Sequence, residues 1–455
     1  MIEQAQRGRR RRWPLIIGAL VVVLVVVIAG AVGWWFTGGA EYWARSRWQP
    51  PKEALLSSMK VRPVPGWKTN VADLGLPPGS TIATLDAPWL PSLFTNTPPR
   101  TYLLVSSPGQ TTPQWWLTGV DATNGRPLFP SVKLNTSAGM PRCFLNGAAV
   151  VCISDDRTAA TAWVIDGQSG ELTYNGPTNV RLTTGKLVAA QAGNYLVAAT
   201  KGEGLFGVGP HAETTWFVPG AGVVGGGHND DVMLQSGSRE GAVTMFSLQD
   251  GRVLTPEFPE GADMQNSDFF EDGFVGEFSE RQGPSFFQFF DTAGRLVSDN
   301  RVPGMFIGGA TGNVTAIVRS DGFGVYGPSG DKLLDVDGEL PNGVQLIGTT
   351  LWVGEDNGGD ADHYQAFDLR TGDKGKSCAF NAINGYLGTD GSVFVRSPWN
   401  SKSDDLALAY DLTTCEKVWS IQRPAGSVAR MTRIGDTFVR TSDDGTEVMS
   451  LVTPS

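Results

Sequence analysis

The sequence predicts an all-β protein folded as a β-propeller of four-stranded antiparallel blades, most simply eight blades, with seven as the next choice. A strand–turn–strand motif recurs along the chain, and its copies lie about 40 residues apart. Short alternating apolar runs of the kind that form strands flank each copy. A period near 40 residues with about four short strands per unit is typical of propeller blades.

The repeated turn combines an aspartate with a glycine three or four residues later. Five aspartates occupy its first position: Asp121, Asp166, Asp291, Asp368 and Asp411. A carboxylate there accepts a hydrogen bond from a backbone N–H two residues on, and the glycine takes the positive φ that a branched residue resists. In the last of the five turns Cys415 stands in the place of the glycine. These aspartates are therefore interpreted as structural turn residues.

Weaker copies of the turn fill the gaps in the series at residues 208–210, 247–253 and 326–332. The last unit lacks one strand after those expected at Val428–Arg433, Thr437–Thr441 and Glu447–Val452. Residues 67–71 are able to supply it, which would close the ring and remove its free edges. Eight turns and one split unit would make nine blades. We instead expect eight, because the Gly-rich stretch 203–227 and the irregular stretch 86–100 inflate the count.

The turn resembles the repeat of PQQ-type propellers. That repeat has an Ala two residues before the Asp, a D-x-x-[TS]-G turn, and a Trp at the end of the next strand. Residues 409–419, which end in Trp419, match it best. The family includes quinoprotein dehydrogenases and the non-catalytic BamB-type propellers that assist outer-membrane assembly. The resemblance covers roughly residues 67–455 and implies the fold, with Trp419 packing between blades, but it does not specify the function.

The large domain is acidic. The first 36 residues hold five Arg and one acid, so the remainder carries 31 basic and 45 acidic residues, a net charge of −14. Nucleic-acid binding is not expected, since contacts to phosphate need a basic face. Solubility is the simplest explanation of the acidity.

The four cysteines predict two disulfides. Cys143 and Cys152 flank an expected hairpin, and Cys378 and Cys415 lie in the outer strands of consecutive units. An even number of cysteines in an exported protein favours disulfides over free thiols. Since no C-x-x-C motif occurs, the sequence gives no support to zinc or thioredoxin chemistry.

The N-terminal region predicts a membrane anchor. Residues 1–14 form a basic tail, and Leu15–Phe36 is an uncharged apolar run of 22 residues, long enough to span a hydrocarbon core of about 30 Å. Arginines before the run place the N-terminus in the cytoplasm and the rest outside it, as a single-pass protein of the plasma membrane. A cleaved signal peptide is the competing interpretation, but its apolar region would usually be shorter. No cysteine stands directly after the run, so the lipid anchor of the BamB type is not expected.

Residues 37–66 are expected to be an extracytoplasmic linker, because Pro-rich stretches favour extended chain, with a short helix possible over Lys52–Met59. The propeller is expected to occupy residues 67–455. Within it, Gly220–Gly227 lacks the Lys-Ser/Thr ending of a phosphate loop and is interpreted as a strand of small residues.

No catalytic, cofactor-binding or metal-binding residue is predicted. Quinoprotein enzymes, as a family, stack PQQ against a disulfide of adjacent cysteines and hold Ca²⁺ and an Asp base, and this sequence has no Cys-Cys pair. His211, His228 and His363 are scattered and show no metal-ligand spacing. The acidic stretch Asp356–His363 lacks the order of an EF-hand loop and is interpreted as a polar hairpin loop.

The sequence therefore favours a non-catalytic, membrane-anchored, extracytoplasmic propeller that binds other proteins at the bacterial cell envelope. Propellers suit this role because the loops of every blade meet on one face. Two alternatives stay open: a PQQ-dependent quinoprotein dehydrogenase, and a ligand-sensing or carbohydrate-binding module.

Overall fold

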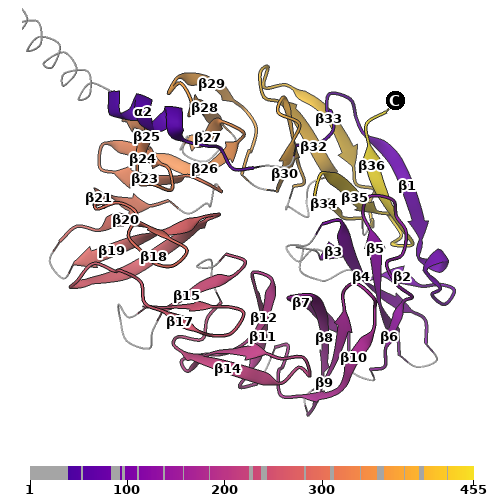
Figure 1. The fold of residues 1–455 in the computed structure, drawn as a ribbon. Helices are drawn as coiled ribbons and strands as arrows, with labels where there is room; N and C mark the ends of the chain where they lie inside the picture. Colours follow the sequence, from indigo (N-terminus) through magenta and orange to yellow (C-terminus); the bar gives the residue numbers. More distant parts are fainter. Residues whose placement is uncertain are drawn as a thin grey trace, which may run out of the picture.

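The computed structural model describes residues 39–454, apart from 53–54, 84–92, 95–97, 110–111, 137–138, 157, 184, 225–228, 237–242, 281–282, 308–311, 339, 356–362, 384, 399–403 and 428. Its strands form nine sheets around a common centre (Figure 1). Each sheet is one blade of an all-β propeller. The expectation of eight or seven blades was therefore wrong, and the ring has nine.

The blades follow one another along the chain, and their strands have the following bounds. Blade 1 contains β2 (Thr81–Ile82), β3 (Leu93–Phe94), β4 (Arg100–Ser107), β5 (Gln114–Asp121) and β6 (Val132–Leu134). Blade 2 contains β7 (Arg142–Asn146), β8 (Ala149–Asp155), β9 (Ala160–Asp166) and β10 (Leu172–Thr178). Blade 3 contains β11 (Val188–Ala192), β12 (Tyr195–Thr200), β13 (Gly204–Val208) and β14 (Thr214–Pro219). Blade 4 contains β15 (Val232–Ser236), β16 (Val243–Ser247) and β17 (Val253–Leu254). Blade 5 contains β18 (Ala262–Phe270), β19 (Gly273–Glu280), β20 (Phe286–Asp291) and β21 (Val302–Pro303). Blade 6 contains β22 (Met305–Phe306), β23 (Thr315–Arg319), β24 (Gly322–Tyr326) and β25 (Lys332–Asp337). Blade 7 contains β26 (Pro341–Ile347), β27 (Thr350–Glu355), β28 (Tyr364–Asp368) and β29 (Lys374–Cys378). Blade 8 contains β30 (Tyr386–Thr389), β31 (Val393–Arg396), β32 (Asp405–Asp411) and β33 (Lys417–Gln422). Blade 9 contains β34 (Met431–Ile434), β35 (Thr437–Thr441), β36 (Glu447–Val452) and β1 (Val64–Asn70).

Within a blade the strands follow chain order from the centre of the ring to its rim, as blade 8 shows in Figure 1, except that the outermost strand of blade 9 is β1. Two blades depart from the regular pattern. In blade 1, β2 and β3 both pair with β4. In blade 4 the described residues form three strands. The described parts of both irregular stretches therefore contribute strands to blades, with β3 in blade 1 and β13 and β14 in blade 3, and they did not inflate the count.

The ring is closed by pairing the two ends of the domain. β1 pairs antiparallel with β36, with Val64 opposite Val452 and Lys68 opposite Met449. The expected closure, with an early strand completing the last blade, is therefore confirmed. Closure leaves each blade with a neighbour on both sides and removes the open end that an incomplete ring would expose.

The hydrophobic core consists of nine clusters, one at each junction between neighbouring blades. Strand β4 shows the reason in its sequence, because both faces of the strand are apolar. Leu103 packs toward blade 9 and Leu104 toward blade 2, since successive side chains point to opposite faces of a strand. The near-continuous apolar runs of the blades therefore reflect sheets that are buried on both faces.

The chain before β1 is a structured part of the domain, and we call residues 39–63 the N-terminal segment. It begins with helix α2 (Ala40–Arg47), which lies against β25 of blade 6 (Figure 1). The chain then passes blades 7 and 8 toward β1. The helix thus lies upstream of the expected Lys52–Met59, where residues 55–59 are not helical. The described residues of the segment that pack on the ring therefore belong to the folded domain, whereas the sequence had suggested a linker over residues 37–66.

Side chains of the N-terminal segment enter two junction cores. Ala44 and Trp48 are buried in the cluster between blades 6 and 7, and Leu56 and Met59 in the cluster between blades 8 and 9. Backbone hydrogen bonds support this course, since Leu56 N–H donates to the Thr389 carbonyl at 2.9 Å. The segment therefore links blades 6 to 9, from β25 of blade 6 to the end of β30 in blade 8 and the Trp419 ring between blades 8 and 9.

Two further expectations concern the glycine-rich stretch and the anchor. Residues 220–224 form no strand, although Ala221 N–H donates to the Ser236 carbonyl of β15 at 2.7 Å. The strand expected at Gly220–Gly227 is thus absent from its described part, because one backbone hydrogen bond does not make a ladder. The predicted anchor Leu15–Phe36 lies outside the described residues, and among those described no helix is long and apolar enough to cross a membrane.

Candidate interaction site

The aspartates of the repeat hold turns at the ends of the third strands. One carboxylate oxygen of Asp411 accepts the N–H groups of Thr413 and Thr414, both at 2.8 Å. Asp166 accepts those of Gln168 and Ser169, at 3.0 and 2.7 Å. The backbone N–H groups hold the pKa of each carboxyl below its usual value, because they stabilise the charged form.

The same arrangement recurs in three other blades. The carboxylates of Asp121, Asp291 and Asp368 accept the backbone N–H two residues on, at 2.8, 2.9 and 2.7 Å. Since all five aspartates are engaged by their own turns, their role in the structure is local and needs no ligand.

An aromatic side chain from one blade covers the turn of the next. The Phe129 ring lies where a Cβ at Gly170 would be, and the Trp216 ring lies against Gly251 in the same way. Both glycines have positive φ, at 71° and 70°. Two separate features therefore require glycine at these positions: the positive φ of the backbone and the close approach of the aromatic ring.

Trp419 of blade 8 lies at the corresponding place beside blade 9, but blade 9 has no turn there for the ring to cover. Its indole N–H donates to the Met59 carbonyl at 2.7 Å, and its ring is part of the core between blades 8 and 9. Blade 9 has no turn between its last two strands, because its outer strand comes from the start of the domain. The N-terminal segment takes the place of the missing turn beneath Trp419.

Both predicted disulfides are confirmed. Cys143 and Cys152 face each other on β7 and β8, with Cα atoms 3.9 Å apart. Cys378, at the end of β29, joins Cys415 in the turn of blade 8. Cys415 has a φ of 68°, the left-handed conformation that glycine adopts in the other turns. At this junction a covalent bond thus replaces the contact between a ring and a glycine.

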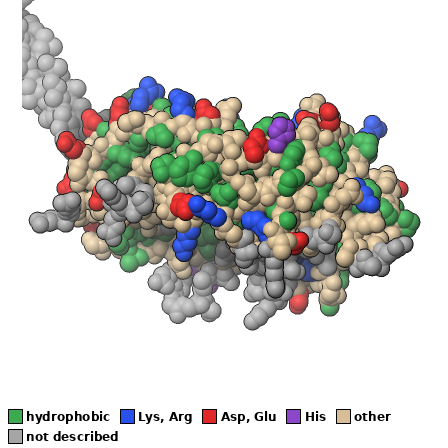
Figure 2. Space-filling view, turned by 90° about the horizontal axis from the view of Figure 1, so that it is seen from below, with side chains coloured by type: hydrophobic (Ala, Val, Ile, Leu, Met, Phe, Trp, Pro, Cys, Tyr) green, Lys and Arg blue, Asp and Glu red, His purple; other side chains and the backbone are tan. Residues whose placement is uncertain are grey.

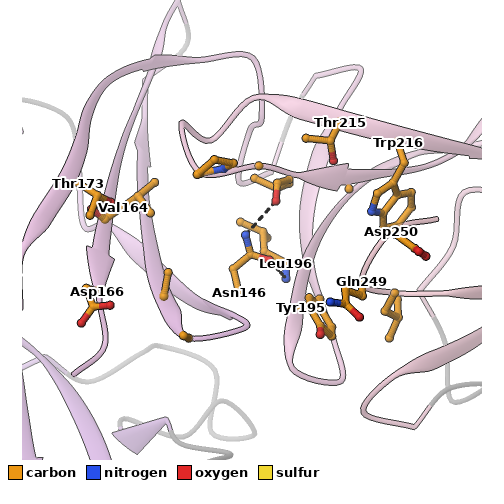
Figure 3. A pocket seen from close by; sticks show the side chains of 17 residues that line it. Asn146, Val164, Asp166, Thr173, Tyr195, Leu196, Thr215, Trp216, Gln249 and Asp250 are labelled. Carbon is orange, nitrogen blue, oxygen red and sulfur yellow. Dashed lines mark hydrogen bonds between the residues drawn. The ribbon is translucent and has the colours of Figure 1, made fainter. Parts of the chain in front are cut away.

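A groove of about 730 Å³ crosses the turns of blades 2, 3 and 4 (Figure 3). Its apolar lining comes from three blades and includes Ala148, Val164, Leu196, Val208 and Trp216. Two of the blades are joined at the groove: the Asn146 amide of blade 2 donates to the Val208 carbonyl of blade 3 at 2.9 Å, and its oxygen accepts from the N–H of Leu196, also of blade 3, at 3.3 Å. The groove is thus a feature of the assembled ring rather than of one blade.

Charged and polar groups flank the apolar part of the groove. Asp166 and Asp250 line it from blades 2 and 4, and Figure 3 places them on opposite sides. Backbone N–H groups, of Ser169 and Arg252 respectively, lower the pKa of both carboxyls, so both are charged at neutral pH. Tyr195 also lines the groove. Its pKa is raised, mainly by burial and to a smaller extent by the negative charge of the nearby Asp231. The groove therefore suits a segment that carries apolar and basic side chains.

The remaining candidates for chemistry are dispersed. The His211 ring packs on Tyr174 with centroids 5.4 Å apart, and the His363 carbonyl accepts a hydrogen bond from Glu355 N–H. His228 and most of the acidic stretch, residues 356–362, lie outside the described residues. Within the described part of the chain, no group of three or more His, Cys, Asp or Glu side chains is placed to hold a metal ion.

The surface seen at the rim of the ring carries mixed charges. Figure 2 shows basic and acidic side chains scattered among hydrophobic ones, without a continuous field of either sign. Sequence reasoning identified the turns and disulfides but missed the groove. Asp166 and Asp250 belong to the repeated turns and so offered a partial signal, whereas Asn146 and Leu196 carry no pattern that sets them apart.

Comparison with known proteins gives a match over almost the whole described chain. Residues 40–454 match the family described as a conjugation-associated 9-bladed beta-propeller domain. An uncharacterized protein of Mycolicibacterium smegmatis (strain MKD8) is 36% identical over 436 residues, which cover 90% of this chain and 89% of the relative. The family match begins at α2, in agreement with a domain that includes the N-terminal segment.

Two solved structures show distant similarity. A structure of the eukaryotic initiation factor has a TM-score of 0.46 at 11% identity, over 75% of this chain and 89% of that one. The computationally designed Ika8 protein has a TM-score of 0.37 at 11% identity, over 68% and 95%. Both similarities are too weak to carry an inference.

Proposed function

Because the chain belongs to the conjugation-associated nine-bladed β-propeller family, we propose that it is a non-catalytic scaffold of the bacterial cell envelope that binds a protein partner in a conjugation-associated assembly. The groove across blades 2 to 4 carries this proposal. It is open, mostly apolar, built by three blades, and flanked by two charged carboxylates. Those features fit an extended or helical peptide segment with apolar and basic side chains.

The proposed location is the outer surface of the plasma membrane, with residues 15–36 as the anchor and the N-terminus in the cytoplasm. The arginine cluster before the apolar run supports this topology. Two disulfides support it too, since disulfides persist in oxidising compartments. Reporter fusions after residue 60 test it: activity of a reporter that works only in the cytoplasm would contradict the topology.

Site-specific photo-cross-linking in cells tests the partner. A photoreactive residue at Thr215, which lines the groove, is expected to give a discrete cross-linked protein. The same residue at Arg126, in the exposed turn of blade 1, serves as the control and is expected to give none. Equal cross-linking at both positions, or none at either, would contradict the groove as the binding site.

A charge substitution tests the chemistry of the partner. Gln249 lines the groove, is exposed, and lies next to Asp250. Gln249→Lys is expected to reduce the cross-link at Thr215 several-fold, because it adds a like charge to a basic partner. Gln249→Glu is expected to preserve or increase it. The reverse order would show that the partner is acidic.

The quinoprotein alternative makes a separate prediction. A PQQ-dependent dehydrogenase reconstituted with PQQ and Ca²⁺ would reduce a dye in the presence of an alcohol or sugar. We expect no such turnover, and calcium-dependent PQQ binding with dehydrogenase activity would overturn the scaffold proposal.

A further inference from the structure

Helix α2 has two distinct faces. Its inward face holds it on blade 6: the Glu41 carboxylate pairs with Lys332 at 3.0 Å, and Arg45 donates to the Leu333 carbonyl at 3.0 Å. Ala44 on the same face is buried. Because these contacts involve a hydrophobic residue, an ion pair and a backbone acceptor, the orientation of α2 on the ring is set.

The opposite face carries two exposed aromatic residues and a cation. Tyr42 is 58% exposed and Trp43 is 47% exposed, and Ser46 and Arg47 are exposed one turn further on. Their spacing along the helix places the four residues on one side. Tyr and Trp concentrate at membrane–water interfaces, where the ring enters the headgroup layer and its polar edge stays hydrated, and Arg reaches toward phosphate.

The position of α2 in the chain brings this face close to the predicted anchor. The apolar run ends at Phe36, and α2 begins at Ala40. Four residues span at most about 14 Å even when fully extended. The headgroup layer on each side of a bilayer is about 5–8 Å thick. An anchored chain therefore holds the first turn of α2 at or just beyond the headgroups.

We propose that the outward face of α2, formed by Tyr42, Trp43, Ser46 and Arg47, lies against the lipid headgroups on the extracytoplasmic side of the plasma membrane. This contact holds the propeller against the membrane by the part of its rim at blade 6. The inference rests on the proposed anchor and adds an orientation to it. Blade 6 and its neighbours face the bilayer, while the groove of blades 2 to 4 lies on another part of the ring and stays accessible to a partner.

Fluorescence quenching in nanodiscs tests the contact with the full-length chain. All four cysteines of the sequence are in disulfides, so single introduced cysteines can be labelled selectively. Ser46→Cys reports on α2, and Asn175→Cys on β10 of blade 2 is the matched exposed control. With an environment-sensitive label and headgroup spin-labelled phosphatidylcholine in the disc, we expect quenching at least threefold greater at position 46 than at position 175.

Substitution of the aromatic pair separates contact from proximity. Tyr42→Ser with Trp43→Ser is expected to lower quenching at position 46 at least twofold, while the protein stays in the disc. Phe217→Ser, which removes an exposed aromatic residue from β14, is expected to leave it unchanged.

Three outcomes would overturn the proposal. Equal, weak quenching at both positions in an inserted protein would contradict the lipid contact while leaving the anchor intact. A blue-shifted label at position 46 without lipid quenching would show that protein covers the face instead. Failure of the full-length chain to insert would contradict both the anchor and this contact.

Discussion

The two sides of the ring are held together in different ways. Among blades 1 to 4, the ring that covers a turn comes from the preceding blade at two junctions: Phe129 of blade 1 lies over Gly170 of blade 2, and Trp216 of blade 3 lies over Gly251 of blade 4. Between blades 6 and 9, the cover comes from elsewhere. Trp48 of the N-terminal segment fills the junction of blades 6 and 7, a disulfide joins blades 7 and 8, and Met59 meets Trp419 at blades 8 and 9.

The difference separates local from long-range stabilisation. Phe129 and Gly170 belong to consecutive repeats, so their contact forms when two neighbouring blades fold. Trp48 packs with Phe367, which is more than three hundred residues away in the chain. Contacts of such separation bring the entropic cost of closing a long loop. Blades 6 to 9 therefore depend on the N-terminal segment, which is far away in the chain, whereas the ring–glycine contacts of blades 1 to 4 join consecutive blades.

The largest expected effect is the loss of Trp48. Trp48→Ala removes a side chain that is 5% exposed from the core of blades 6 and 7, and we expect it to lower the free energy of unfolding by about 3–5 kcal/mol. Calorimetric melting of the purified protein measures it. Trp43→Ala, on the same helix but exposed, is the control and is expected to stay within about 0.5 kcal/mol. A loss for Trp48→Ala as small as that expected for Trp43→Ala would show that burial of Trp48 does not stabilise the ring.

The two disulfides should differ in their contribution. Cys378–Cys415 closes a separation of 37 residues and Cys143–Cys152 one of 9. In the chain-entropy description, removal by paired Cys→Ala substitutions lowers the free energy of unfolding by about 4 kcal/mol for the first and about 2.5 kcal/mol for the second. Denaturant titration of the two double variants gives the order. A larger loss for Cys143–Cys152 would contradict the distinction between a bond joining blades and a bond within one.

A smaller effect concerns the backbone at Cys415. Once Cys378→Ala has removed the disulfide, residue 415 still has to adopt a φ of 68°. Cys415→Gly should therefore be more stable than Cys415→Ala in that background by about 1 kcal/mol, because only glycine adopts this conformation without steric cost. The difference in melting temperature between the two double variants measures it, and no difference would mean that the turn rearranges.

An effect no larger than this is expected from the turn aspartates, which both sides of the ring share. Asp411→Ala should cost about 1 kcal/mol at pH 7, since the N–H groups of Thr413 and Thr414 lose their acceptor but stay accessible to water. Asp411→Asn keeps an oxygen acceptor and should cost less. The pKa of Asp411 is lowered in the folded state, so its contribution is present above the unfolded pKa and is lost as the pH falls through the folded value. The difference between Asp411→Ala and the parent protein should therefore shrink below about pH 4, and a constant difference would contradict a charged acceptor.

The repeat made much of the fold predictable from sequence. Asp166 and Gly170, or Asp368 and Gly372, specify a turn within five residues, and the strands beside them alternate between two buried faces. Two of the three closing strands, Thr437–Thr441 and Glu447–Val452, have the expected bounds, and the third, β34 (Met431–Ile434), begins and ends slightly later than expected. Both disulfides were predictable because each pair lies on neighbouring strands or blades, where the closest partner is also the correct one.

The number of blades, the course of residues 39–63 and the groove were decided by the tertiary structure. Counting turns suggested nine units, but only the assembled ring shows that the irregular stretches near β3 and β14 belong to real blades. Ala44, Trp48, Leu56 and Met59 follow no period, because each fills a gap between blades rather than one face of a helix or strand. The groove combines Asn146, Leu196 and Trp216 across blade boundaries. The sequence by itself determined the turns and strands, whose hydrogen bonds form within a few residues, whereas contacts between distant parts of the chain depend on how the blades pack around the ring.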